Sequence, residues 1–198
     1  MKTITIDDLL DELIQKEGGF TKDPKDRAHY GKANPAEGQR WDCFCTNLGI
    51  TQATLSDYYG RQATEQEVRN LTVTLAREIY ERVYLTGPRI DTLPALIAPA
   101  VFDFGVNSGS RRAIRVLQEL VNKAGFGPIG TDGAIGPKTR EAVAKACQTM
   151  GPWFVNAYQE ERRQFLEDLI RRDPSQERFR NGWMTRVASF ELPITRSA

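Results

Sequence analysis

Glu17 is the residue whose type and position most clearly suggest chemistry. It stands four residues after Leu13 and seven after Leu10, on the apolar face of a helix predicted over 7–16. Loss of water there, together with the negative end of the helix dipole, predicts a carboxyl pKa above the usual value of about 4.3. The two glycines that follow leave room for a ligand. A protonated carboxyl beside an open approach suits general acid catalysis; the alternative is a helix end whose glutamate points into water.

Further carboxylates follow Glu17 within one long loop. Asp23, Asp26 and Glu37 all lie between residues 21 and 47, where no helical pattern is sustained. Glycoside hydrolysis uses one carboxylic acid and one carboxylate, so this part of the chain carries the groups for such a reaction. For Asp26 the structural alternative is a solvated turn aspartate beside Pro24.

The composition bounds the class of protein. The chain has 198 residues, 40% of them hydrophobic and 27% charged, with a formal net charge of +1. These values are typical of a globular protein and do not indicate a nucleic-acid partner, although arginines clustered at 111–115 and 162–172 leave a local basic face open. No stretch is long and apolar enough to predict an integral membrane segment. Because Asp7 and Asp8 stand where a signal peptide needs its apolar centre, we expect no secretory signal.

The three cysteines do not predict a metal site. Cys43 and Cys45 are two apart, Cys147 is distant, and His29 is the only histidine. A zinc site needs more ligands at better spacing. We therefore expect reduced or locally paired thiols on a loop, and neither a metal nor another cofactor.

Apolar spacing elsewhere predicts a mainly α protein. A capping box joins Thr64 to Glu67, and the loop region before residue 47 has room for a small β-hairpin, for instance around 41–44. Helices are predicted over 52–59, 72–84, 94–104, 110–124, 137–150 and 152–171. No flexible linker separates them, so we expect one compact unit with two lobes and a monomer.

Several short motifs together resemble a known enzyme family. Residues 17–20 read Glu-Gly-Gly-Phe, 23–26 read Asp-Pro-Lys-Asp, 46–51 read Thr-Asn-Leu-Gly-Ile-Thr, and 102–109 read Phe-Asp-Phe-Gly-Val-Asn-Ser-Gly. In this order they resemble family 108 of the glycoside hydrolases, which are bacterial and phage N-acetylmuramidases with a lysozyme-like helical fold. The link between the second and third motifs is expanded over 27–45. Residues 130–139 resemble a motif of predicted peptidoglycan-binding segments, and the alternative there is a tight loop needed only for folding.

The resemblance implies a role for each candidate residue. Glu17 would protonate the glycosidic oxygen between N-acetylmuramic acid and N-acetylglucosamine, and Asp26, or else Asp23 or Glu37, would orient water or stabilise the transition state. Thr46 would help to place that water. A sugar groove would be lined by Tyr30, Trp41, Asn47, Phe104 and Asn107. For each aromatic residue in this set, plain core packing is the alternative.

The resemblance also implies an organisation and a place of action. We expect a lysozyme-like unit over 1–198, with an N-terminal catalytic lobe over 1–90 and a C-terminal helical lobe over 91–198 that carries the peptidoglycan-binding-like segment. The expected partner is the glycan strand of peptidoglycan, reached in the periplasm or cell wall after release or export. Two other hypotheses remain: a wall-binding or secretion accessory protein that does not cut, and a glycosidase acting on chitin-like polymers.

Overall fold

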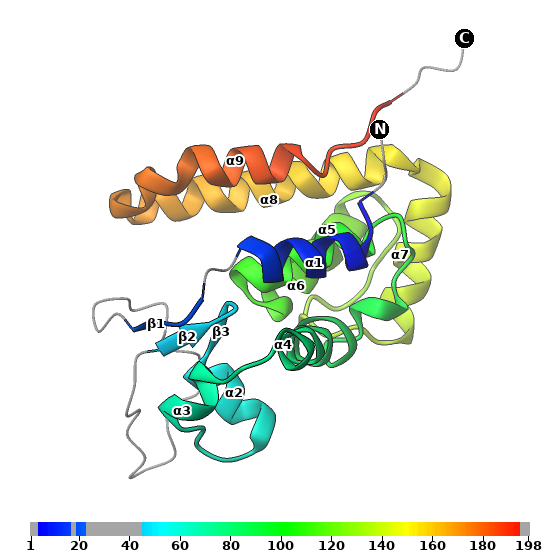
Figure 1. Cartoon of the computed structure of the whole chain (residues 1–198). Coiled ribbons are helices and arrows are strands. Elements are labelled where there is room, and N and C mark those ends of the chain that lie inside the picture. The colour runs from blue at the N-terminus through cyan, green and yellow to red at the C-terminus, as the bar shows by residue number, and fades with distance from the viewer. Residues whose placement is uncertain (1–3, 17–18, 23–44, 195–198) are drawn as a thin grey trace. The chain divides into compact units, whose positions relative to one another are not determined.

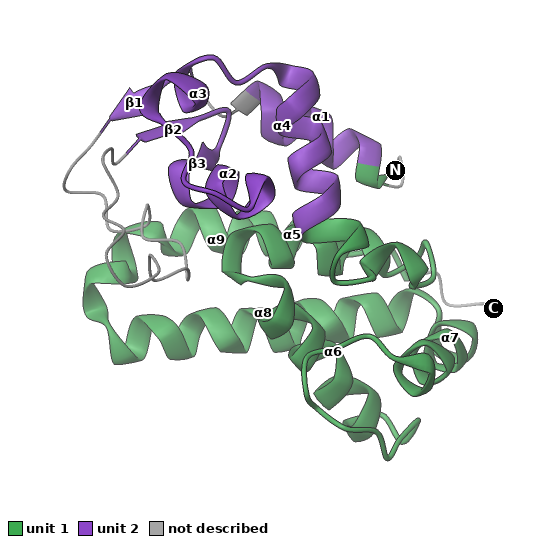
Figure 2. Ribbon diagram, turned by 90° about the horizontal axis from the view of Figure 1, so that it is seen from below, with its two compact units in different colours: residues 1–6, 84–198 green, residues 7–83 purple. Residues whose placement is uncertain are grey.

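The structure, a computed structural model, describes residues 4–16, 19–22 and 45–194. They form two compact units (Figures 1 and 2). Unit 2 is residues 7–83, and unit 1 combines residues 1–6 with 84–198. The division into a catalytic lobe over 1–90 and a helical lobe over 91–198 remains a prediction.

Unit 2 holds a small sheet and short helices. In chain order its elements are α1 (Ile6–Lys16), β1 (Thr21–Lys22), β2 (Cys45–Asn47), β3 (Ile50–Thr51), α2 (Gln52–Tyr59), α3 (Glu65–Arg69) and α4 (Val73–Tyr80). The strands form an antiparallel sheet in the order β1-β2-β3. Its core contains side chains that are at most 1% exposed: Leu9, Leu10, Ile50, Leu55, Val68 and Ile79.

The helix ends of unit 2 follow the predicted capping chemistry. The Thr51 hydroxyl accepts a hydrogen bond from the Thr54 backbone N–H at the start of α2, and Gly60 ends that helix with a φ of 66°. Thr64 and Glu67 form the predicted capping box at the start of α3.

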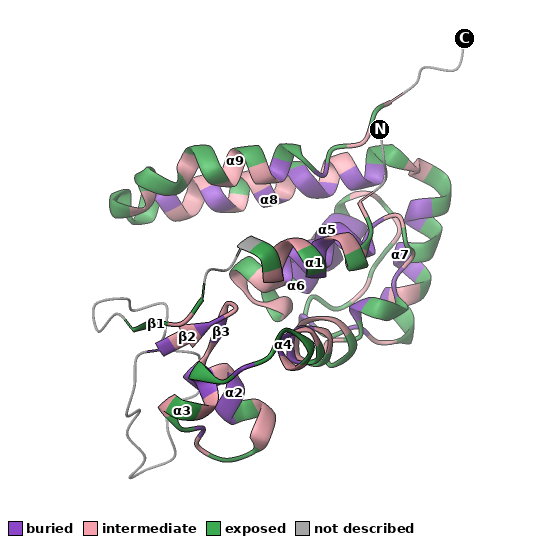
Figure 3. Cartoon of the chain, viewed as in Figure 1, coloured by how far each residue is buried: buried purple, intermediate pink, exposed green. Residues whose placement is uncertain are grey.

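Unit 1 is a set of longer helices. They are α5 (Ala98–Ser108), α6 (Ser110–Lys123), α7 (Pro137–Met150), α8 (Pro152–Arg172) and α9 (Arg180–Ala188), with short 3-10 turns at Ile90–Thr92 and Pro174–Phe179. α5 contacts α6 and α8, and it is almost wholly buried (Figure 3). α8 and α9 lie side by side and run in opposite directions (Figure 1).

The mainly α, lysozyme-like fold class with a small hairpin is confirmed, but two helices differ from the prediction. The central helix begins at Ala98 rather than at Pro94. The backbone N–H groups of Ile97 and Ala98 both donate to the Pro94 carbonyl and form a turn before the helix, and Pro99 lies in the first helical turn, a position that favours proline. The helix predicted over 72–84 changes at residue 81 into a π-helical segment, Glu81–Thr86. The strand candidate at 41–44 lies outside the described residues.

The α9 helix was absent from the sequence prediction. Only Val187 of this helix is buried, so its sequence has no apolar stripe of helical period. Among the described residues, no helix combines the length and the apolar character that crossing a bilayer requires. Cys45 is disulfide-bonded, whereas Cys147 is a buried free thiol.

Candidate active site

Helix α1 leads directly to the candidate acid. Leu9 and Leu10 are buried, and the Arg77 guanidinium of α4 donates to Asp11 at 2.6 Å and to Asp7 at 2.5 Å. These contacts hold α1 against α4, and the helix ends at Lys16, the residue before Glu17. Glu17 itself lies outside the described residues, as do Asp23, Asp26, Tyr30, Glu37 and Trp41.

Three threonines share one face of the small sheet. The register pairs Thr21 with Thr46 and Thr46 with Thr51, and directly opposed residues of antiparallel strands point to the same side. Thr21 is exposed, and Thr46 and Thr51 are half-buried. Cys45, Asn47 and Ile50 are buried, which places the opposite face of the sheet against the core of unit 2. Thr46 therefore lies on the open face of the sheet, beside a strand that starts four residues after Glu17.

A strained turn sets the position of β2 and β3. Leu48 and Gly49 both have positive φ values, 50° and 72°, the pattern of a two-residue type I′ hairpin turn. Leucine rarely adopts this conformation. The Tyr80 hydroxyl donates to the Leu48 carbonyl at 3.2 Å, which helps to hold the turn that follows Thr46 and Asn47.

Asn47 fastens the sheet to α3. Its side chain is 7% exposed, and its Nδ2 donates to the carbonyls of Val68 and Arg69, both at 3.0 Å. An amide NH₂ has two protons to donate, so both are used within the protein. In this arrangement Asn47, predicted to bind substrate, supports the strand that carries Thr46.

Strand β1 is held to α3 from its exposed side. The Arg69 guanidinium lies 3.8 Å from the centroid of the Phe20 ring, and Lys22 pairs with Glu65 at 2.6 Å. The hydrogen bond from Lys22, with a second from Arg69, lowers the pKa of Glu65. The chain just after the Glu-Gly-Gly motif is therefore positioned by α3.

The two site candidates on α5 have different environments. Phe104 is fully buried, with its ring centroid 5.6 Å from that of Phe165 and 6.3 Å from that of Tyr158. It occupies the core of unit 1, as the packing alternative predicts. Asn107 is exposed, and its Nδ2 donates to the Asp103 carbonyl at 2.7 Å.

A buried ion cluster beneath Asn107 joins α5, α8 and α9. The Asp103 carboxylate, 1% exposed, accepts from Arg162 at 2.7 Å and from Arg186 at 2.6 Å and 2.9 Å. Arg162 is 3% exposed. Sequence reasoning treated Asp103 only as part of a motif. The available signal was a single carboxylate in an otherwise apolar helix, because a buried charge needs a partner.

The Asp-Gly motif at 132–133 is a loop organised around a buried glutamine. Gln118 Nε2 donates to the Asp132 carboxylate at 3.0 Å, and Gln118 Oε1 accepts from the Gly133 N–H at 2.8 Å. The hydrogen bond from the Ala134 N–H is the main reason that the pKa of Asp132 is lowered. Gly133 has a φ of 76°, and a Cβ there would lie 2.5 Å from the Arg111 carbonyl oxygen. These contacts give the motif a role in folding.

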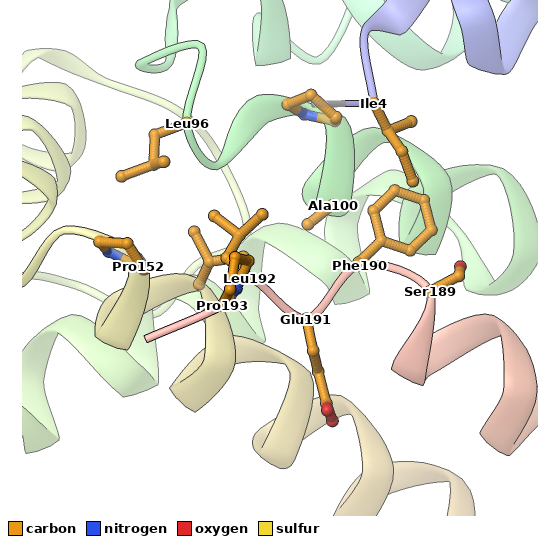
Figure 4. A pocket seen from close by; sticks show the side chains of 11 residues that line it. Ile4, Leu96, Ala100, Pro152, Ser189, Phe190, Glu191, Leu192 and Pro193 are labelled. Atoms are coloured by element: carbon orange, nitrogen blue, oxygen red, sulfur yellow. The ribbon is translucent and has the colours of Figure 1, made fainter. Parts of the chain in front are cut away.

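An apolar pocket of about 390 Å³ lies in unit 1 (Figure 4). Its walls come from the first turns of α5 and α8, from Ile4 and from the segment 189–193. Thr46, Asn47, Phe104 and Asn107 do not line it. In the described part of the chain, no group of three or more His, Cys, Asp or Glu side chains is arranged to hold a metal ion.

Comparison with known proteins identifies the class to which this fold and these motifs belong. A search of the curated proteins finds no match. The family described as glycosyl hydrolase 108 matches residues 10–109, and the family described as a predicted peptidoglycan domain matches residues 112–188. Among solved structures, that of Brucella abortus SagA is 32% identical, covers 92% of this chain and 88% of its own, and superposes with a TM-score of 0.69.

The protein is therefore a glycoside hydrolase with a peptidoglycan-related segment. It belongs to glycosyl hydrolase family 108, as the order of its motifs indicated. The match to the peptidoglycan family supports peptidoglycan as its ligand and indicates a place of action in the cell wall or periplasm.

Proposed function

We propose that the protein is an N-acetylmuramidase that hydrolyses the β-1,4 bond between N-acetylmuramic acid and N-acetylglucosamine. The observation that carries this proposal is the arrangement around the Glu-Gly-Gly motif. A packed helix ends at the residue before Glu17, and Thr46 lies on the open sheet face beside the strand that follows. Glu17 is the general acid that protonates the leaving oxygen.

The second carboxylate in this proposal is Asp26. It orients the attacking water or stabilises the oxocarbenium-like transition state, and Asp23 and Glu37 are the alternatives. The Thr46 hydroxyl helps to place the water. Tyr30, Trp41 and Asn107 contact the sugars, and the protein acts as a monomer. The buried Asn47 and Phe104 support the site and do not touch substrate.

Hydrolysis of purified sacculi tests the role of each carboxylate. Wild-type protein should release soluble muropeptides whose reducing ends, after borohydride reduction, are N-acetylmuramic acid by mass spectrometry. Glu17→Gln should release none while keeping its circular dichroism spectrum. Asp26→Asn should be strongly impaired, and Asp23→Asn, in the same loop, is its matched control. Full activity in Glu17→Gln would refute the acid role, and N-acetylglucosamine at the reducing ends would refute the bond specificity.

The threonine is tested with a hydroxyl-retaining control. Thr46→Val should lower kcat with little change in KM, because the hydroxyl acts on the water and not on substrate binding. Thr46→Ser should restore most of the rate. Equal activity of the valine and serine variants would remove Thr46 from the mechanism.

A second function, wall binding without cleavage, is favoured by the peptidoglycan family that matches residues 112–188. Such a protein would sediment with intact sacculi and release no soluble fragments. The same assay therefore separates the two functions.

A further inference from the structure

The turn between α8 and α9 presents an ordered, exposed surface that the proposed reaction does not use. Most side chains over 171–181 are exposed (Figure 3). The Asp173 carboxylate accepts from the Ser175 backbone N–H and hydroxyl at 3.1 Å and 2.6 Å, and Arg180 binds Glu177 at 2.7 Å. These bonds fix the turn before any ligand arrives, which lowers the entropy cost of binding.

Two aromatic rings stack on this turn. Phe179 is 41% exposed, and its ring centroid lies 5.7 Å from that of Trp183 with an interplanar angle of 27°. Single exposed apolar residues are common on protein surfaces. A stacked pair on a fixed turn is a larger apolar surface. Its exposed part does not contribute the stability that burial would provide. Flat aromatic surfaces of this kind suit the C–H faces of β-linked sugar rings.

The charges around the rings leave one neighbouring arginine without an ion pair. The Arg178 guanidinium lies 4.6 Å from the Phe179 ring centroid, and no carboxylate of the described residues forms a salt bridge with it. Asp173 influences it only through its charge, since the Asp173 oxygens accept from neighbours in the turn. Three other acids near this turn are paired with arginines other than Arg178: Asp168 with Arg171, and both Glu167 and Glu177 with Arg180.

We propose that Arg178, Phe179 and Trp183 form a second binding surface for the peptidoglycan glycan strand, here named the hairpin-end surface. An N-acetylhexosamine ring packs on the aromatic pair, and Arg178 binds a carboxylate of an adjacent acidic stem peptide. The match rests on chemistry, since peptidoglycan alternates neutral sugar faces with anionic peptides. All three residues fall within the segment matched by the peptidoglycan family. The inference rests on the proposed function only in taking the same polymer as ligand.

Sedimentation with insoluble sacculi on ice, in the full-length Glu17→Gln background, tests this surface. Phe179→Ala should weaken binding by about tenfold, and Phe179→Tyr should bind within about twofold of the parent. Arg178→Gln should weaken binding to intact sacculi but not to glycan strands whose stem peptides an amidase has removed. Trp153→Ala is the matched control, because Trp153 is 58% exposed on α8 and has no ring partner among the described residues; it should bind like the parent.

The outcomes separate this inference from the proposed function. Equal binding by Phe179→Ala and Trp153→Ala would overturn the surface, as would full binding by Phe179→Leu, which keeps apolar bulk without an aromatic face. Thermal melting checks that each variant is folded, and Phe179→Tyr and Arg178→Gln still test the surface if the alanine variant is not. If the wild-type chain cuts no glycan, and Phe179→Ala still weakens binding to sacculi, the hydrolase is refuted and the surface stands.

Discussion

Replacing Asp103 by asparagine should destabilise the protein strongly, although the two side chains have nearly the same shape. The carboxylate accepts three hydrogen bonds from Arg162 and Arg186 at 2.6–2.9 Å. Asparagine removes the negative charge and leaves Arg162, which is 3% exposed, without its counter-charge. Breaking a buried ion pair in this way costs about 3–5 kcal/mol. That is a large part of the roughly 5–15 kcal/mol by which a protein is usually stable.

Arg162→Met is the informative comparison. It should cost less, about 1–3 kcal/mol, because Asp103 keeps Arg186 and loses only one charged hydrogen bond. Methionine also replaces the buried Nε and Nη1 atoms of Arg162, which have no hydrogen-bond partner among the described residues. The double variant should be more stable than the sum of the two losses predicts, because the residues interact directly.

Urea unfolding followed by circular dichroism measures these differences. With an m-value of about 2 kcal/mol/M, a loss of about 4 kcal/mol lowers the midpoint by roughly 2 M. A loss below about 1 kcal/mol in Asp103→Asn, or an equal loss in Arg162→Met, would refute the claim that an uncompensated buried charge dominates.

Three further predictions follow from single contacts. The hydrogen bond from Arg61 is the main reason that the pKa of Glu67 falls from 4.5 to about 2. The stability that this shift provides is complete above pH 4.5 and is lost as the pH falls toward 2. The melting temperature of Glu67→Gln should therefore depend less on pH over this range than that of the wild type. Gln118→Leu should cost about 1–3 kcal/mol and speed amide exchange at Gly133, since that buried N–H loses its acceptor; unchanged exchange would contradict this. Burial raises the pKa of the Cys147 thiol to about 11, so a thiol reagent at pH 8 should label it only as fast as the protein unfolds, and rapid labelling of the native protein would disprove it.

Apolar periodicity predicted the helices that bury a continuous stripe. α6, for example, buries Ala113, Ile114, Leu117, Leu120 and Val121, all in the predicted pattern. It could not predict α9, whose position depends on Arg186 reaching a carboxylate 83 residues earlier in the chain. The start of α5 was misplaced because apolar residues continue through the turn that precedes the helix.

The order of the motifs indicated the enzyme family, but it did not predict the environment of the individual candidate residues. Asn47 and Asn107 have the same side chain, yet one is buried with both amide protons bonded and the other is exposed. Motif spacing contains no information on this difference, which arises from contacts with α3 and α5. The role of Gln118 was invisible for the same reason, because its partners lie 14 to 21 residues further along the chain.

Ile4 and residues 189–193, far apart in the sequence, line the same pocket, and this has a consequence for biosynthesis. Ile4 lines it together with Phe190 and Leu192, so unit 1 combines segments from before and after unit 2. A ribosome releases the chain from its N-terminus, and residues 7–83 have all their internal contacts available while α8 and α9 are still unmade. Ile4 must wait for the last segment to emerge. Ile4 is therefore synthesised before unit 2 but reaches its native position only after the segment at 189–193 has been made.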